Sequence, residues 1–445
     1  MITVADIINV CKAKYLGKDI NLNCENFNTD TREINKDDIY VGIKGEVYNG
    51  NNFYKEAFEK GAKICILDKD TIIEEKYKNF PILLVDNTIE TIQKLANFKR
   101  KKYNIPVVAI TGSVGKTSVK DMIYRVLSKK YNVLCNIGNK NNHIGVPLTI
   151  LKLKDENAMI LEMGMNHFGE IHKLSTMASP TIGVISTIGT AHIGNLGSRE
   201  NILKAKLEIL DGIENNGPLV INNDNDLLHT VKYQNLITTG IDNQSNYMAK
   251  NLNIDAFSST FTIDDNTITI PIGSDAFVRN ALLAYAVGKY LKVDDTDIKN
   301  ALENMELTPH RLQKINTEKY TIIDDTYNAS LDSIKNAAEI LNRTNKRKVF
   351  IFADILELDE YGKQIHEEIG KIFIENKIDL LITVGSLSKY TNDIFKKENN
   401  NCYHFNNNKE LIENIIPLLK EEDIILVKGS HSMNLIEVVE YLKRA

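Results

Sequence analysis

Residues 111–117, with the sequence TGSVGKT, have the composition of a loop that binds phosphate groups. They follow an apolar strand-like run, VVAIT, and precede a helical pattern, so backbone N–H groups and a helix N-terminus could surround a phosphate. Lys116 would then reach the terminal phosphates of a nucleotide, and Thr117 would bind Mg²⁺. Ile110 stands where the GxxxxGK(S/T) pattern has its first glycine, and a glycine-rich turn formed by chance is the alternative. The predicted nucleotide-binding residues of this segment are Thr111, Gly112, Ser113, Val114, Gly115, Lys116, Thr117 and Ser118.

Two further polar residues stand at the ends of strand-like segments. Glu162 ends the apolar run AMILE, and His192 follows the segment TIGTA. In a parallel sheet the carboxyl ends of the strands share one edge, so both side chains would project beside the phosphate loop. Taken alone, the carboxylate could cap a helix and the histidine could be a core residue. Their shared edge favours divalent metal binding instead.

The segments that must position these residues predict a parallel sheet. From Pro106 onward, the runs VVAIT, NAMILEM, TIGVISTIG and GPLVINND alternate with helical patterns. Residues 241–274 are predicted to form antiparallel strands, followed by the helix FVRNALLAYAVGKYL. We assign all of these segments to one central domain.

Two more α/β regions flank this domain. The first hundred residues alternate DDIYVGIKG, AKICILD and FPILLVD with helix-like stretches, and end in the basic, polar segment FKRKKYNIP, where we place a boundary near Lys101. After Pro309 the alternation resumes with YTIIDDTYN, KVFIFADIL, DLLITVGS and DIILVKGS, which is typical of a Rossmann-like domain. The predicted fold is therefore α/β with three domains, residues 1–100, 101–309 and 310–445.

Length and composition exclude several classes of protein. The 445 residues exceed the roughly 100–200 of one ordinary domain, and a net charge of −5 argues against a nucleic-acid partner. No window approaches the ~20 apolar residues of a membrane span, and no basic, apolar leader opens the sequence. Five scattered cysteines form no CxxC pair, so we expect a cytoplasmic protein. We also expect a monomer.

Several motifs together resemble one known family. TGSVGKTSVK, NKNNHIGVPLT, LEMGMNHFGEI, IGTAHIGNLGS, AKLEI, DDTYNA, LEL and VKGS occur in the order found in Mur ligases. The opening segments NTDTR, DDIYVGIKGE and FYKEAFEKGA also resemble the amino-terminal domain of that family. The resemblance covers nearly the whole chain. It implies a UDP-substrate domain, a central ATP-binding domain with a phosphate loop and a carboxyl-terminal ligase domain.

The resemblance also implies a reaction. It indicates an ATP-dependent amide ligase that adds D-alanyl-D-alanine to UDP-N-acetylmuramoyl-tripeptide in peptidoglycan precursor synthesis. ATP would convert the substrate carboxylate into an acyl phosphate, the amine would attack, and the tetrahedral intermediate would lose phosphate. A carboxylate is a poor electrophile, whereas an acyl phosphate has a good leaving group, so phosphoryl transfer makes amide formation possible.

Roles in phosphoryl transfer follow from the same resemblance. Lys116 is expected to contact the transferred phosphate, while Thr117 and Glu162 hold one Mg²⁺ and His192 helps to hold a second. The lysine that matches Lys206 is carbamylated in many relatives, which would turn a cation into an anion able to assist the metal site. From its helical pattern alone, Lys206 would be read as a solvated surface charge.

Three further residues match family positions around the nucleotide. Arg311, in the segment TPHR, matches an arginine at the junction of the second and third domains, where it could bridge phosphate across a closing cleft; a hinge-surface arginine is the alternative. Asp325 matches a loop that faces ATP and the incoming amine, where it would touch the ribose, although an ordinary turn would look similar. The third, Asn280, matches a family residue on the adenine side of the nucleotide site.

The remaining candidates match substrate-contacting segments of the family. The turn NTDTR is expected near the uridine diphosphate, the loop NKNNHIG near the substrate and phosphates, and the loop DDTYNA near the amine. Ordinary polar turns are the alternative for each. The predicted substrate-binding residues are Asp30, Thr31, Arg32, Asn139, Asn141, Asn142, Tyr327 and Asn328.

The sequence also departs from the family pattern. Ala276-Phe277 replaces a His-Asn pair, Ser330-Leu331 replaces Asn-Pro, Ala353 replaces a glycine, and Asn49-Gly50-Asn51 replaces Asp-Gly-His. Because such loops select the amine, a related ligase with a different amine is one alternative. A catalytically silent nucleotide-binding paralogue is another, and a phosphate-loop NTPase that drives a conformational switch is a third.

Overall fold

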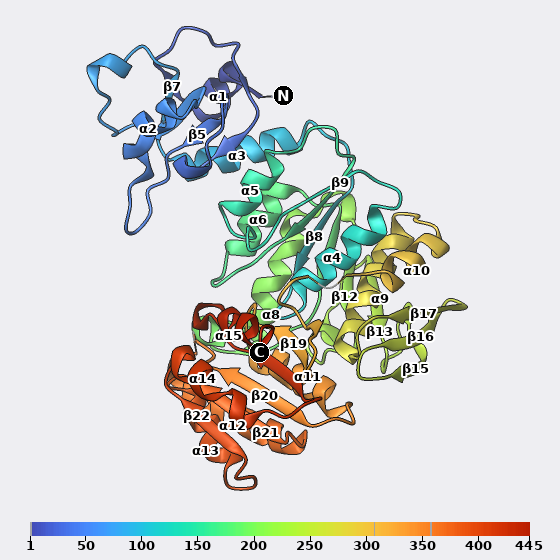
Figure 1. The fold of residues 1–445 in the computed structure, drawn as a ribbon. Helices are drawn as coiled ribbons and strands as arrows, with labels where there is room; N and C mark the ends of the chain where they lie inside the picture. Colours follow the sequence, from blue (N-terminus) through green and yellow to red (C-terminus); the bar gives the residue numbers. More distant parts are fainter. Residues whose placement is uncertain (1, 307, 357) are drawn as a thin grey trace. The chain divides into compact units, whose positions relative to one another are not determined.

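The computed structural model describes residues 2–306, 308–356 and 358–445 (Figure 1). The chain divides into two compact units. The first comprises Met1–Thr111, Lys130–Val184 and Ala205–Leu219, and the second comprises Gly112–Lys129, Ile185–Lys204 and Val220–Ala445. Within the described ranges, no helix is both long enough and apolar enough to cross a membrane.

A five-stranded sheet is built from residues that precede position 100. Its order is β2-β7-β6-β5-β4, with β2 antiparallel to β7 and the other neighbours parallel. A short antiparallel pair, β1 and β3, lies outside this sheet. The elements are β1 (Ile2–Thr3), α1 (Val4–Cys11), β2 (Lys14–Tyr15), β3 (Asn23–Cys24), β4 (Phe27–Asn28), β5 (Ile39–Val41), α2 (Tyr54–Glu59), β6 (Ile64–Asp68), β7 (Ile82–Val85) and α3 (Thr88–Arg100).

A seven-stranded sheet follows, in the order β14-β13-β12-β11-β8-β10-β9. Strands β8, β10 and β9 are parallel and fully apolar except at their carboxyl ends, which is the pattern of strands covered on both faces. The elements are β8 (Val107–Thr111), α4 (Lys116–Leu127), β9 (Val133–Cys135), α5 (Gly145–Ile150), β10 (Ala158–Glu162), α6 (Glu170–Ala178), β11 (Ile182–Ile185), α7 (Ile193–Leu196), α8 (Arg199–Leu207), β12 (Leu219–Asn222), β13 (Leu236–Gly240) and β14 (Tyr247–Met248).

The basic segment near Lys101 is not a free linker throughout. Lys99 and Arg100 form the last turn of α3, and both side chains are buried. The Lys99 ammonium donates to the Leu151 carbonyl at the end of α5 (2.6 Å), and the Arg100 guanidinium donates to the Ala178 carbonyl at the end of α6 (3.0 Å). Cations suit helix C-termini because the last carbonyls there lack helical partners. These contacts bind α3 to the helices of the central sheet.

The predicted antiparallel region is confirmed with one exception. Strands β15 (Lys250–Ile254), β16 (Ser259–Ile263) and β17 (Asn266–Ile270) pair antiparallel, and α9 (Asp275–Tyr290) is the expected helix. Strand β14 lies within the same predicted range, but it pairs parallel with β13 and extends the seven-stranded sheet. Helix α10 (Asp295–Glu303) completes this region.

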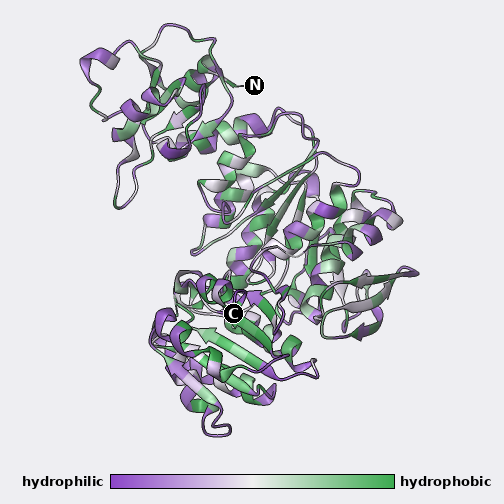
Figure 2. Ribbon diagram, in the orientation of Figure 1, coloured by the Kyte–Doolittle hydropathy of each residue, from purple (hydrophilic) through white to green (hydrophobic). Residues whose placement is uncertain are grey.

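A six-stranded sheet forms the carboxyl-terminal region, in the order β18-β19-β23-β20-β21-β22. Only β18 is antiparallel, so β19, β23 and β20 end at one edge of the sheet. Figure 2 shows these strands as hydrophobic. The elements are β18 (Gln313–Asn316), β19 (Thr321–Asp325), α11 (Leu331–Asn342), β20 (Lys348–Ala353), α12 (Gly362–Glu375), β21 (Leu380–Val384), α13 (Ser388–Phe395), β22 (Cys402–Phe405), α14 (Asn408–Asn414), β23 (Ile424–Lys428) and α15 (Ile436–Leu442).

Lowering the pH is expected to destabilise this region through His366 on α12. The imidazole is completely buried, accepts the Ile355 N–H at Nε2 (3.1 Å) and has Nδ1 2.7 Å from the Gly362 carbonyl, so it is required in its neutral form. Burial lowers the pKa of His366 below its ordinary value. Its contribution to stability is therefore complete above about pH 6.5 and is lost as the pH falls below that value. Thermal unfolding measured between about pH 7.5 and 5 should show a steeper loss for the wild type than for His366→Gln, and equal slopes would contradict the assignment.

Candidate active site

The phosphate loop has a backbone that depends on glycine. Gly115 has φ 88°, the left-handed region, and α4 begins at the next residue with no side chain capping its first turn. The hydroxyl of Ser186, just after β11, donates to the Val114 carbonyl (2.6 Å), and the Ser113 N–H donates to the Thr187 carbonyl (2.8 Å). The loop is thus held in place from the neighbouring strand end while the N-terminus of α4 can receive an anion.

Replacing Gly115 by alanine is expected to weaken nucleotide binding by about tenfold or more. A left-handed backbone costs an L-residue roughly 1–2 kcal/mol, and the new Cβ would lie 3.0 Å from the Asn280 side-chain oxygen. ADP titration calorimetry measures the effect. Gly61→Ala is the matched control, because Gly61 also has a left-handed φ (100°) but belongs to the amino-terminal sheet region. Equal ADP affinity in Gly115→Ala and wild type would contradict the role of this loop.

Cationic groups converge on the loop from two segments of the chain. The Lys116 ammonium donates to the Gly112 carbonyl (2.7 Å) and lies 3.3 Å from the Ser113 carbonyl, so it arches over the loop that precedes it. The Arg311 guanidinium donates to the Thr117 hydroxyl (3.0 Å). Among the described residues, the buried hydroxyl of Ser113 has no hydrogen-bond partner. Two cations and an unpartnered donor at a helix N-terminus suit a phosphate chain.

Arg311 is also stacked on an aromatic ring. Its guanidinium carbon lies 3.9 Å from the centroid of the Tyr327 ring, which is close enough for a cation–π interaction. The structure therefore brings together Thr117, Arg311 and Tyr327, which are far apart in the sequence. These contacts favour the predicted phosphate-side role of Arg311 over the alternative of a hinge-surface arginine.

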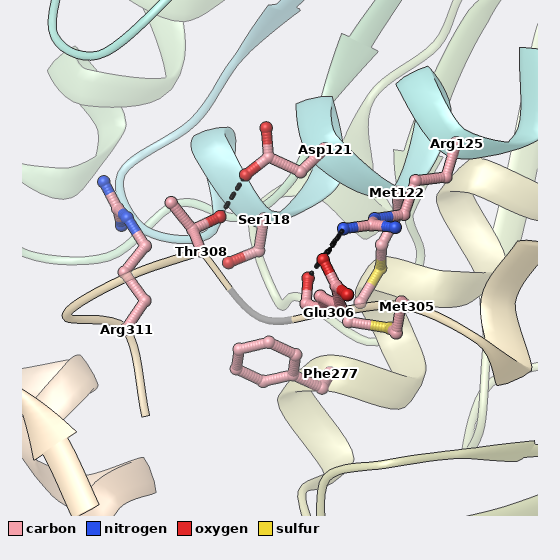
Figure 3. A pocket seen from close by; sticks show the side chains of 9 residues that line it. All are labelled: Ser118, Asp121, Met122, Arg125, Phe277, Met305, Glu306, Thr308 and Arg311. Atoms are coloured by element: carbon pink, nitrogen blue, oxygen red, sulfur yellow. Dashed lines mark hydrogen bonds and ion pairs between the residues drawn. The ribbon is translucent and has the colours of Figure 1, made fainter. Parts of the chain in front are cut away.

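A small pocket lies along α4, beside the phosphate loop (Figure 3). The Phe277 ring lines one side of it. The Thr308 hydroxyl donates to the Asp121 carboxylate, and the Arg125 guanidinium donates to the Glu306 carbonyl (3.2 Å), so these polar groups are already paired. The pocket is lined by Ser118, Asp121, Met122, Arg125, Phe277, Met305, Glu306, Thr308 and Arg311.

Glu162 stands at the carboxyl end of β10, next to the strand that leads into the phosphate loop. The register partner of Glu162 is Ile110 of β8, and Glu162 is 3% exposed. The Asn141 amide donates to the Glu162 carboxylate (2.9 Å), so these two side chains lie together. Asn136 holds the same residue by its backbone, since its side chain accepts from the Glu162 N–H and donates to the Glu162 carbonyl, both at 2.9 Å. Asn136 was not predicted; its position one residue after β9 was the available signal.

The other two asparagines of this loop have different surroundings. The Asn142 side-chain oxygen accepts the N–H groups of Ile144 (3.1 Å) and Gly145 (2.9 Å), so it stabilises the turn that leads into α5. Asn139 is exposed. Neither side chain contacts Glu162 in the hydrogen bonds of the described residues.

Lys206 is a buried lysine, so reading it as a surface charge from its helical pattern is wrong. It lies in α8, and its side chain is 1% exposed. His192 has a left-handed φ of 65° and immediately precedes α7. In the described part of the chain, no group of three or more His, Cys, Asp or Glu side chains could hold a metal ion. That does not exclude Mg²⁺, which commonly uses one or two protein ligands together with waters and substrate phosphates.

The predicted uridine-side residues form an exposed turn after β4. The Asp30 carboxylate accepts from the Arg32 guanidinium at 2.6 Å, and this pairing lowers the pKa of Asp30 to about 2. The Arg32 side chain is 83% exposed, while Thr31 is buried. The turn therefore presents one guanidinium to solvent and holds it with its own carboxylate.

The third-domain loop is held by Lys428, which is not among the predicted site residues. Lys428 ends β23, and its ammonium donates to the Asp325 carboxylate (2.6 Å) and to the Asn328 carbonyl (2.8 Å). The other Asp325 oxygen accepts the Leu312 N–H (3.2 Å). Lys428 belongs to the motif VKGS, whose place at the end of an apolar strand was a usable signal.

Residues 110–288 match the Mur ligase middle domain, and residues 310–431 match the domain described as Mur ligase, glutamate ligase domain. The sequence is 35% identical over 422 residues to the UDP-N-acetylmuramoyl-tripeptide–D-alanyl-D-alanine ligase of Bacillus subtilis (strain 168), a match that covers 93% of this chain and 92% of that protein.

Solved structures show the same relationship. A crystal structure of MurF from Acinetobacter baumannii is similar with a TM-score of 0.91 and 27% identity, over 100% of this chain and 99% of that one. The MurF ligase of Thermotoga maritima, crystallised in complex with ADP, is similar with a TM-score of 0.82 and 26% identity, over 94% and 97% of the two chains.

Proposed function

Because this chain belongs to the Mur ligase family, we propose that it uses ATP to join D-alanyl-D-alanine to the terminal carboxylate of UDP-N-acetylmuramoyl-tripeptide. The chain is a carboxylate–amine ligase with a nucleotide-binding middle region. The observation that carries the proposal is similarity to ligases of this specificity along nearly the whole chain. Residues 1–100, 101–309 and 310–445 would serve as the UDP-substrate, ATP-binding and amine-side domains.

Phosphoryl transfer would be carried by the phosphate loop and its cations. The N-terminus of α4 and the backbone of residues 112–117 would hold the phosphates of ATP, and Lys116 would leave the loop carbonyls for the transferred phosphate. Arg311, held beside Thr117, would offset the charge that develops during transfer. The acyl phosphate then has the leaving group that the amine requires, and closure around it would exclude water.

The residues present fit Mg²⁺. Mg²⁺ takes oxygen ligands, and the Thr117 hydroxyl and the buried Glu162 carboxylate supply two; His192 would assist a second ion. When bound, the ions would spread the negative charge of the transferring phosphoryl group. Asn141 would keep the Glu162 carboxylate oriented for this task.

Lys206 is proposed to act as a carbamate. Almost complete burial of a lysine is unusual unless the amine is paired, neutral or modified. A neutral amine reacts with carbon dioxide, and the resulting carbamate is an anion, which would support a cationic metal rather than repel it.

The substrate ends are assigned to the two outer regions. Asp30, Thr31 and Arg32 would meet the uridine diphosphate, where an exposed guanidinium suits a pyrophosphate. Asp325 and the turn of Tyr327 and Asn328 would face the ribose and the amine. The asparagines 139, 141 and 142 would lie near the substrate and phosphates.

The test is phosphate release by the purified protein with ATP and Mg²⁺, when UDP-N-acetylmuramoyl-tripeptide and D-alanyl-D-alanine are supplied separately and together, with mass spectrometry of the product. Release that requires both, with a pentapeptide product, supports the proposal. Release that requires the tripeptide together with a different amine would indicate a related ligase. The specific reason to consider this outcome is Ser330-Leu331 in the amine-side loop. ATP turnover without a carboxylate substrate would indicate an NTPase, and no turnover a silent paralogue.

A further inference from the structure

Lys428 lies in the middle of the carboxyl-terminal sheet at its functional edge. It is the last residue of β23, between β19 and β20, and its register partner on β19 is Asp325. The side chain is only 3% exposed. A buried ammonium needs partners, and this one has two with good geometry, the Asp325 carboxylate (2.6 Å) and the Asn328 carbonyl (2.8 Å).

The contact between the Lys428 ammonium and the Asn328 carbonyl is not needed to neutralise the Asp325 carboxylate. Asp325 already has Lys428 at one oxygen and the Leu312 N–H at the other. A lysine has three donors, and the one directed at the Asn328 carbonyl joins the far end of the 325–328 turn to its start. Burial raises the pKa of the Asp325 carboxyl, and the Lys428 ammonium opposes that rise.

The turn held in this way carries the aromatic ring under Arg311. Tyr327 lies between the two tied residues, and its N–H donates to the His310 carbonyl (3.1 Å). Its ring lies 3.9 Å from the Arg311 guanidinium carbon, and Arg311 donates to the Thr117 hydroxyl at the phosphate loop. A continuous series of contacts therefore leads from Lys428 to the phosphate side of the site.

We propose that Lys428 is a positioning residue that fixes the Asp325–Asn328 turn and, through Tyr327, the guanidinium of Arg311. This inference rests on the proposed function, in which the turn faces the amine and Arg311 faces the phosphate. The buried Lys428 ammonium aligns both the turn and Arg311, so that the amine attacks the acyl phosphate before water does.

Lys428→Met removes the ammonium and keeps most of the side-chain volume. We expect amide formation to fall by about 100-fold, since misplacement of a reacting group by about 1 Å has that effect. The KM for D-alanyl-D-alanine should rise, while the KM for UDP-N-acetylmuramoyl-tripeptide should stay unchanged, because its proposed uridine contacts lie in the amino-terminal region. The ratio of phosphate released to pentapeptide formed should rise above one as water competes for the acyl phosphate.

The double variant Asp325→Asn/Lys428→Met separates positioning from simple charge pairing. It leaves no unpaired buried charge, so its melting temperature should recover relative to Lys428→Met. Its Asn328 carbonyl still lacks the ammonium, so the product ratio should remain above one. Lys346→Met is the control, since Lys346 is half-exposed, pairs with Glu422 and precedes the amino end of β20.

All variants are measured beside the wild type in the phosphate and product assay. An uncoupled double variant with a recovered melting temperature supports the inference. A double variant that is as tightly coupled as an active wild type overturns the inference alone and leaves the proposed function standing. A wild type that forms no pentapeptide overturns both.

Discussion

Replacing Lys116 by alanine is expected to lower ATP-dependent phosphoryl transfer by about 10³-fold or more without unfolding the chain. The side chain arches over its own loop, and its ammonium donates to the Gly112 and Ser113 carbonyls of that loop. Preorganised cations at a transferring phosphoryl group are commonly worth 10³-fold or more in rate. The lost interaction strengthens in the transition state, so kcat should fall more than the affinity for ATP.

ADP formation in the presence of both substrates measures this effect, and circular dichroism verifies the fold. Lys129→Ala is the matched control, because Lys129 is an exposed lysine just beyond the other end of the same helix. A Lys116→Ala enzyme with more than about a tenth of the wild-type rate would remove Lys116 from the mechanism. Equal losses in both variants would point instead to a general effect on α4.

Replacing Lys206 by alanine is expected to cost about 100-fold in activity, with partial recovery when short carboxylic acids are added. The proposed carbamate supplies an anion to the metal site, and loss of such a group commonly costs 10–100-fold. Alanine leaves space at a position that is otherwise almost fully buried, and acetate or propionate could enter that space and replace the anion. Lys206→Met is the control, because it keeps the volume and leaves no space for the acid.

Rate measurements at increasing acetate concentration test this directly, beside the wild type with and without added bicarbonate. Rescue of Lys206→Ala, no rescue of Lys206→Met and stimulation of the wild type by bicarbonate would support the carbamate. A fully active Lys206→Ala enzyme would exclude it. Inactive variants with melting temperatures far below the wild type would assign Lys206 to packing instead.

The phosphate loop was predictable because its function depends on a short, continuous segment. The glycine positions, the lysine at the start of α4 and the preceding apolar strand are local features, and the left-handed φ of Gly115 agrees with its residue type. Glu162 was predictable for a related reason, since the end of an apolar parallel strand has a defined edge.

Other parts of the site were not local in this sense. Nothing in the helical pattern around Lys206 shows that its ammonium is buried, because burial is created by other segments of the chain. Lys99 and Arg100 belong to the basic, polar segment in which a domain boundary was predicted, yet they bind the ends of α5 and α6. Asn136 holds Glu162, which is 26 positions away in the sequence, and Lys428 holds Asp325, which is 103 positions away. Contacts over such distances cannot be predicted from a pattern along the chain.

The sequence by itself therefore determined the α/β class, the phosphate loop and the order of the family motifs, since these depend on periodicity, residue type and spacing. The tertiary structure alone decided which polar groups are buried, which cation lies beside Thr117, and which lysine ties the amine-side turn. Burial, ion pairing and stacking depend on distances between segments far apart in sequence, and only the folded chain sets those distances.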